Sequence, residues 1–96
     1  MTDDDAFYEL EELIREGDKA RDASAFDEAL EHYKKALMIS TEDHELERAS
    51  IYTGIAETKR KQGKAREAES NYEKALALMP GYKPALVALV DIATDE

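Results

Sequence analysis

One stretch of this sequence occurs twice. The segment EALEHYKKALMI at residues 28–39 returns as EAESNYEKALAL at residues 67–78, and six of the twelve aligned positions carry the same residue. Ordinary composition would give about one match by chance. Because a single small unit cannot bury its apolar face alone, recurrence at such a period predicts structural units that stack and share a core.

The apolar residues of the chain recur at three- and four-residue steps and do not alternate with polar residues, which predicts helices throughout. We expect Ser24 to cap the second helix, and Ser40 or Thr41 the third. Gly63 is expected to end the third helix in a left-handed conformation. Short turns would make successive helices antiparallel neighbours. The five predicted helices are 4–22, 26–39, 42–62, 64–79 and 84–96.

Each predicted helix carries one apolar stripe in which small and large residues alternate. Small residues let helix axes approach closely, and large ones fill the gaps beside them. The inward-facing residues are predicted to be Leu10, Leu13, Ile14, Gly17 and Ala20; Phe26, Ala29, Leu30, Tyr33, Ala36 and Leu37; Leu46, Ala49, Tyr52, Ile55 and Ala56; and Ala65, Ala68, Tyr72, Ala75, Leu76 and Met79.

These features resemble the tetratricopeptide repeat, a helical hairpin of about 34 residues. The resemblance covers nearly the whole chain and implies one all-α domain over residues 1–96, in which antiparallel hairpins stack as a short right-handed α-solenoid. The first repeat would span about 10–43, the second about 49–82, and residues 83–96 would form a C-terminal helix. The matching residues are Leu13, Gly17, Ala20, Phe26, Ala29, Tyr33 and Ala36; Tyr52, Ile55, Ala56, Gly63, Ala68, Tyr72, Ala75 and Pro80; and Leu86, Leu89 and Val90.

The sequence departs from the family pattern in three ways. Glu16 stands where a leucine-type residue is usual, and Lys59 stands where a tyrosine is usual. The two copies lie 39 residues apart, so about five residues are inserted around STEDHELE. We expect the insertion to extend the third helix at its N-terminus, because Leu46 keeps the apolar stripe in phase. A longer loop is the alternative.

The charge of the chain is strongly negative and unevenly placed. The net charge is −10, with sixteen acids and six bases in residues 1–48 and seven of each in residues 49–96. An acidic chain disfavours nucleic acid as a partner. Solubility is the simplest reason for the acidity, and a high-salt habitat or a basic partner are the alternatives. There is no cysteine, signal peptide or apolar run long enough for a membrane span, so we expect a cytoplasmic protein.

Little in the sequence points to catalysis, a cofactor or a metal. We find no phosphate loop, nucleophile motif or Cys/His cluster. His32 and His44 are far apart, and both are predicted to be ordinary solvated residues. Adjacent acids such as Glu11 and Glu12 diverge around a helix and do not face each other. We therefore predict a protein that is not an enzyme and has no cofactor.

In the family, ligands usually bind a concave face formed by the first helix of each repeat. The basic segment KRKQGKAR at residues 59–66 overlaps this face: it would either dock an acidic peptide or simply complement the helix dipole. Some members clamp chaperone C-termini with Lys, Asn and Arg, which the matching positions Ile14, Asp18, Gly54, Pro84 and Ala88 cannot do. Carried over by position, the concave face comprises Ile14, Asp18, Arg21, Ser50, Thr53, Glu57, Arg60 and Lys61.

Two functions follow from the sequence. The first is a protein-interaction module that binds a peptide or a partner helix in its concave groove. The second is a self-assembly element, because PALVALVDIA in the last helix is apolar around much of its circumference. We expect Leu86, Leu89, Val90 and Ala93 to face inward. Val87 and Ile92 would then face outward, either to form a homodimer or to stack against a further repeat of a larger protein.

Overall fold

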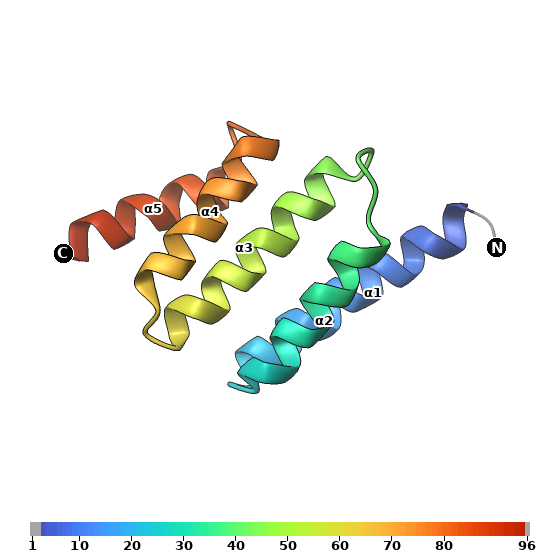
Figure 1. The fold of residues 1–96 in the computed structure, drawn as a ribbon, viewed down its shortest axis with the longest axis horizontal. Helices are drawn as coiled ribbons and strands as arrows, with labels where there is room; N and C mark the ends of the chain where they lie inside the picture. Colours follow the sequence, from blue (N-terminus) through green and yellow to red (C-terminus); the bar gives the residue numbers. More distant parts are fainter. Residues whose placement is uncertain (1–2, 96) are drawn as a thin grey trace.

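The computed structural model describes residues 3–95 and, among them, the side chains of residues 5–94. The helices are α1 (Asp3–Asp22), α2 (Phe26–Ile39), α3 (Glu45–Lys61), α4 (Ala65–Leu78) and α5 (Lys83–Asp95), and they follow one another without a strand in this part of the chain (Figure 1). The prediction of an all-α fold is confirmed. No helix within residues 3–95 is both long and apolar enough to cross a membrane.

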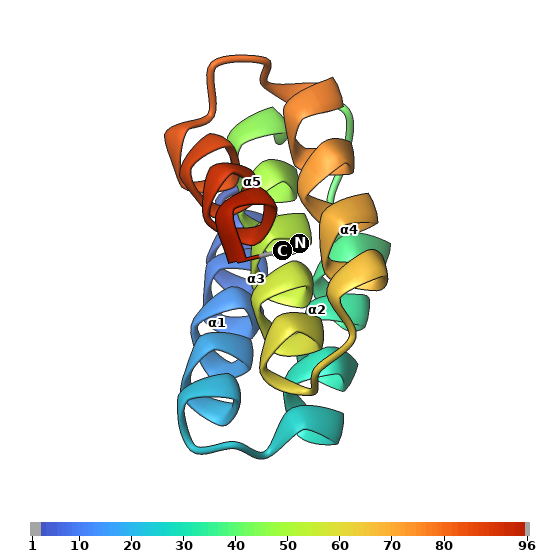
Figure 2. The same cartoon turned by 90° about the vertical axis from the view of Figure 1, so that its left-hand side faces the viewer.

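The helices pair as two hairpins. Helix α1 packs against α2 and α3 against α4, while α3 also contacts both helices of the first hairpin and α5 packs on α4. In Figure 2, α1 and α5 lie on one side of the molecule and α2 and α4 on the other, with α3 between them. This arrangement is the stack of antiparallel hairpins that the repeated sequence predicts.

Helix α3 is buried on two faces, because it belongs to both hydrophobic cores. Ile51 packs with residues of α1 and α2, whereas Ala49 and Ala56 pack with α4 and α5. The sequence pattern predicted a single inward stripe on this helix and missed Ile51, while the expected core residue Tyr52 is only half-buried. A helix enclosed on two sides has no single apolar stripe for the pattern to reveal.

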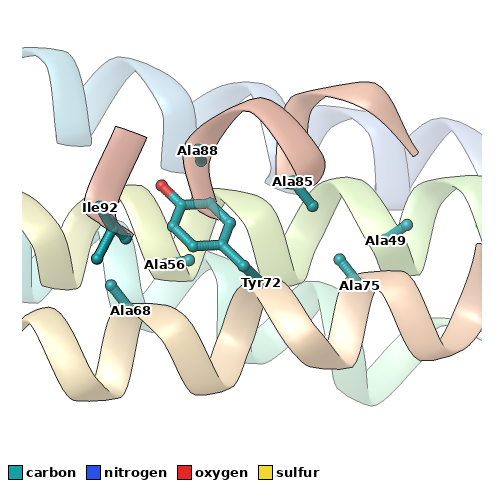
Figure 3. Close-up of a cluster of buried hydrophobic side chains, with 8 residues drawn as sticks. All are labelled: Ala49, Ala56, Ala68, Tyr72, Ala75, Ala85, Ala88 and Ile92. Atoms are coloured by element: carbon teal, nitrogen blue, oxygen red, sulfur yellow. The ribbon is translucent and has the colours of Figure 1, made fainter. Parts of the chain in front are cut away.

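An aromatic ring fills each core. Tyr33 of α2 is fully buried, and its ring lies against the backbone of Gly17 in α1 and Gly54 in α3. Tyr72 of α4 is its counterpart in the second core, where Figure 3 shows the side chain reaching from α4 toward α5 beside Ala88. Glycine is required at the two contact points on Tyr33, because a Cβ at Gly54 would lie 2.5 Å from the ring.

The two turns within the hairpins have the same backbone geometry. Gly63 has φ +80° after α3, as predicted, and Ser24 has φ +61° after α1. In both turns the next residue donates a backbone hydrogen bond five residues back, from Ala25 to Ala20 and from Lys64 to Lys59. Ser24 therefore ends α1 in a Schellman motif. The prediction that it caps α2 is wrong, since Ala25 holds that position without a side-chain hydrogen bond.

The extra residues between the repeats lie in a loop rather than in a longer third helix. Helix α3 begins at Glu45, not at Glu42, and Leu46 is 53% exposed instead of inward-facing. Ser40 does not cap α3: its hydroxyl donates to the Leu37 carbonyl and accepts a hydrogen bond from Arg48 at 2.9 Å. The bond from Arg48 joins α3 to the residue that follows α2. His44 holds the N-cap position of α3 without a side-chain hydrogen bond, so Thr41 does not cap this helix either.

The orientation of α5 also differs from the prediction. Ala85, Ala88 and Ile92 are buried, while Leu86 and Val90, predicted inward, are 42% and 65% exposed. Ile92 was expected to face outward, and that prediction is wrong. Opposite α5, helices α3 and α4 present mainly alanines, so α5 approaches most closely with Ala85 and Ala88 facing them. Ile92 lies four residues after Ala88 and therefore shares this face. Val87 is 59% exposed, as expected.

We predict that Gly17→Ala and Gly54→Ala each lower the free energy of unfolding by about 1–3 kcal/mol, although alanine normally favours a helix. The added methyl group would meet the Tyr33 ring within 2.8 Å. Urea denaturation is the measurement. Gly81→Ala is the matched control, since a Cβ there meets nothing within 4 Å. Equal stabilities for all three variants would contradict the close packing on Tyr33.

Candidate functional site: the groove between α1 and α3

A groove of about 390 Å³ runs between α1 and α3. These two helices are in contact, and both pack on the Tyr33 ring, α1 through Gly17 and α3 through Gly54. The turn before α5 adds one more residue to the wall of the groove. Its lining consists of Glu11, Ile14, Arg15, Asp18, Leu46, Glu47, Ser50 and Tyr82.

The structure brings together three of the eight residues that the sequence placed on a concave face. Ile14, Asp18 and Ser50 all line the groove. The other five lie farther toward the C-terminal ends of α1 and α3 and do not line it. They are Arg21, Thr53, Glu57, Arg60 and Lys61.

Asp18 lines the groove and also holds the aromatic residue behind it. The Tyr33 hydroxyl donates a hydrogen bond of 2.5 Å to Asp18 Oδ1. Arg21 donates to the same hydroxyl at 3.3 Å and to Asp18 Oδ1 at 3.4 Å. These three residues therefore form one network between α1 and α2, and Arg21 is engaged within the protein.

The second hairpin repeats this network 39 positions later. The Tyr72 hydroxyl donates a hydrogen bond to the Glu57 carboxylate, and Arg60 interacts with the same hydroxyl. Glu57 and Arg60 correspond to Asp18 and Arg21. Residues that the sequence suggested as ligand contacts thus hold the buried tyrosine of each hairpin in place.

Burial and hydrogen bonding shift the acid–base properties of these networks. Burial, followed by the hydrogen bond to Asp18, raises the pKa of the Tyr33 hydroxyl well above its ordinary value of 10. Burial and the bond to Glu57 raise the pKa of Tyr72 in the same way. Burial opposes the charge of Arg21, but the neighbouring Tyr33 and Asp18 outweigh it and raise the pKa of the guanidinium. Both phenols therefore stay protonated at neutral pH.

The basic segment at the end of α3 is partly neutralised within the chain. Lys59 forms an ion pair with Glu67 at 3.3 Å, and Arg60 interacts with Tyr72. Lys61 is exposed. Thr53, the remaining predicted contact, is half-buried and donates its hydroxyl to the Ala49 carbonyl at 2.8 Å.

Five residues of the groove lining were missed by the sequence reasoning. Four of them, Glu11, Arg15, Leu46 and Glu47, stand three or four positions from a predicted residue on the same helix. Helical spacing could have identified them, because such positions share a face. Tyr82 lies in the turn between α4 and α5 and follows no periodic pattern.

The described residues offer no arrangement for metal binding. They contain no group of three or more His, Cys, Asp or Glu side chains that could hold an ion. His44 accepts a hydrogen bond from the Thr41 backbone at 3.0 Å and lies against the Phe7 ring. His32 was predicted to be solvated but is half-buried, and its Nδ1 has no hydrogen-bond partner among the described residues.

Comparison with known proteins agrees with this architecture. The family model of the tetratricopeptide repeat matches residues 18–81, two thirds of the chain. The chain belongs to the tetratricopeptide repeat family, whose members are generally protein–protein interaction modules. Searches of curated proteins and of solved structures gave no significant match.

We predict that the two buried tyrosines make stability fall in alkaline solution. The pKa values of both tyrosines are raised in the folded state, so folding keeps the hydroxyl groups protonated at a pH where the unfolded chain ionises. Their contribution to the free energy of unfolding is therefore complete below pH 10 and is lost as the pH rises above it. Above pH 10 each tyrosine lowers the free energy of unfolding by up to about 1.4 kcal/mol per pH unit, as the tyrosine of the unfolded chain ionises. Urea denaturation between about pH 9 and 11 measures the slope.

The Tyr33→Phe, Tyr72→Phe double variant should show a shallower slope, because neither hydroxyl remains to titrate. Tyr8→Phe serves as the control, since Tyr8 is 70% exposed. A double variant with the slope of the unmodified protein would contradict the role of the two networks.

Proposed function

We propose that this protein binds a peptide or a helix of another protein in the groove between α1 and α3. The observation that supports this function is the groove itself, in which apolar and charged side chains from two neighbouring hairpins meet. Apolar surface supplies affinity, and a few polar groups fix the orientation of a ligand.

We expect Ser50→Trp to abolish binding of peptides selected from a random library against the full chain. Ser50 is half-buried in the wall of the groove, so an indole there would occupy the space of the ligand. Binding is measured by fluorescence anisotropy, and circular dichroism checks the fold. Lys34→Trp on the exposed surface of α2 is the matched control and should bind as the unmodified protein does. Equal binding of the peptides by both variants would exclude the groove as the binding site.

The exposed face of α5 favours a second candidate function, self-association. Leu86, Val87 and Val90 are all more than 40% exposed on this one helix. Exposed apolar patches of this kind usually mark an interface. A second copy of the chain could cover them through a two-fold contact, in which the same patch faces itself.

A comparison of α5 with α3 supports this interface. Ile51, Gly54 and Thr58 of α3 are buried, and so are the residues 34 positions later, Ala85, Ala88 and Ile92. Helix α5 thus packs on the second hairpin as α3 packs on the first. The other face of α3 carries Tyr52 and Ala56, which pack with residues of α4. Its equivalent on α5, Leu86 and Val90, lacks such a covering helix within the described residues.

We expect the full chain to sediment as a dimer at tens of micromolar and Val87→Glu to convert it to a monomer. A buried carboxylate in an apolar contact is costly, so the substitution should break the interface. Met38→Glu is the control, because Met38 is 77% exposed on α2, away from the patch. If the unmodified chain sediments as a monomer at this concentration, the proposed dimer is wrong.

A further inference from the structure

The groove between α1 and α3 has a negative charge. Its lining includes three carboxylates, those of Glu11, Asp18 and Glu47, and one guanidinium, that of Arg15. The two walls contribute carboxylates from opposite sides, because Glu11 belongs to α1 and Glu47 to α3. Clefts lined by charges of one sign concentrate ligands of the opposite sign.

Two of these four charges are already engaged within the protein. Arg15 pairs with Glu12 at 3.2 Å, and Asp18 accepts the hydrogen bond of Tyr33. The side chains of Glu11 and Glu47 make no hydrogen bond or ion pair with the described residues. They are therefore the carboxylates of the groove that remain available to a ligand.

The same groove also has an apolar surface, formed by Ile14, Leu46 and Tyr82. Ile14 and Tyr82 are half-buried, and each packs against one of the two hydrophobic cores. Leu46 is 53% exposed in the wall of the groove, where the loop that precedes α3 leaves it uncovered. A ligand that covers this aliphatic side chain removes apolar surface from water, and this burial would stabilise the complex.

We infer that the groove takes a basic peptide segment in which an apolar side chain is flanked by Lys or Arg. The apolar side chain packs against Ile14, Leu46 and Tyr82, while the flanking cations pair with Glu11 and Glu47. This inference rests on the proposed function and specifies the chemistry of the partner. Complementary charge steers such a ligand into the groove and rejects acidic segments.

The basic segment at the end of α3 does not reverse this preference. Lys59 is paired with Glu67, and Arg60 interacts with the tyrosine network of the second hairpin. Neither residue lines the groove. An acidic peptide placed against Ile14 and Leu46 would bring its carboxylates beside Glu11 and Glu47, and like charges in a partly desolvated site repel.

The test uses peptides selected from a random library against the full chain and measures their binding to two charge-reversed variants. Glu11→Lys, Glu47→Lys changes the groove. Glu31→Lys, Glu73→Lys changes the net charge equally, but at exposed positions of α2 and α4. We expect the selected peptides to be basic and apolar. The groove variant should weaken their binding about tenfold or more at low salt, and the surface variant by no more than about threefold.

Salt gives a second measurement. The difference between the two variants should shrink as ionic strength rises from about 0.05 to 0.3 M, because salt screens the lost attraction. Equal weakening by the two variants would overturn the inference, since attraction by the net charge of −10 would then suffice. Acidic selected peptides would also overturn it. If Ser50→Trp still abolished binding of those acidic peptides, the groove would remain the binding site and only its preference would be wrong.

Discussion

The structure depends on the burial of α3 on two opposite faces. Ile51 joins the core of the first hairpin, while Ala49 and Ala56 join the core of the second. If α3 packed on only one side, the two hairpins would be separate, and each would be too small to remove its apolar face from water. The groove follows from the same arrangement, because one of its walls is the remaining face of α3.

Sequence periodicity predicted the order, number and approximate limits of the helices, because short-range spacing and turn residues determine them. It could not predict how each helix is rotated. The α3 stripe omitted Ile51, since a helix packed on two sides has no single apolar face. The α5 stripe placed Leu86 and Val90 inside, because hydrophobicity alone favours the larger residues, whereas close approach to the alanines of α3 and α4 favours Ala85 and Ala88. Ile92 is buried with them because it lies four residues after Ala88, on the same face of the helix.

The site was predictable only in part, for a physical reason. Ile14, Asp18 and Ser50 line the groove between α1 and α3, because position in the repeat determines which wall a residue occupies. Arg21 and Arg60 were interpreted as ligand contacts, yet both interact with buried tyrosines. A carboxylate and an arginine on a helix surface look the same in sequence whether they meet a ligand or a hydroxyl group from the neighbouring helix. Only the fold distinguishes the two.

The ring of Tyr33 has a consequence for recognition. It touches Gly17 on α1 and Gly54 on α3, the two helices that form the walls of the groove. The ring therefore acts as a spacer that sets the width of the groove from behind, without touching the space a ligand would occupy. A change in the thickness of this spacer would widen or narrow the groove while every lining side chain stayed the same. Under the proposed function, selectivity for ligand size would thus depend on the core of the protein as well as on its surface.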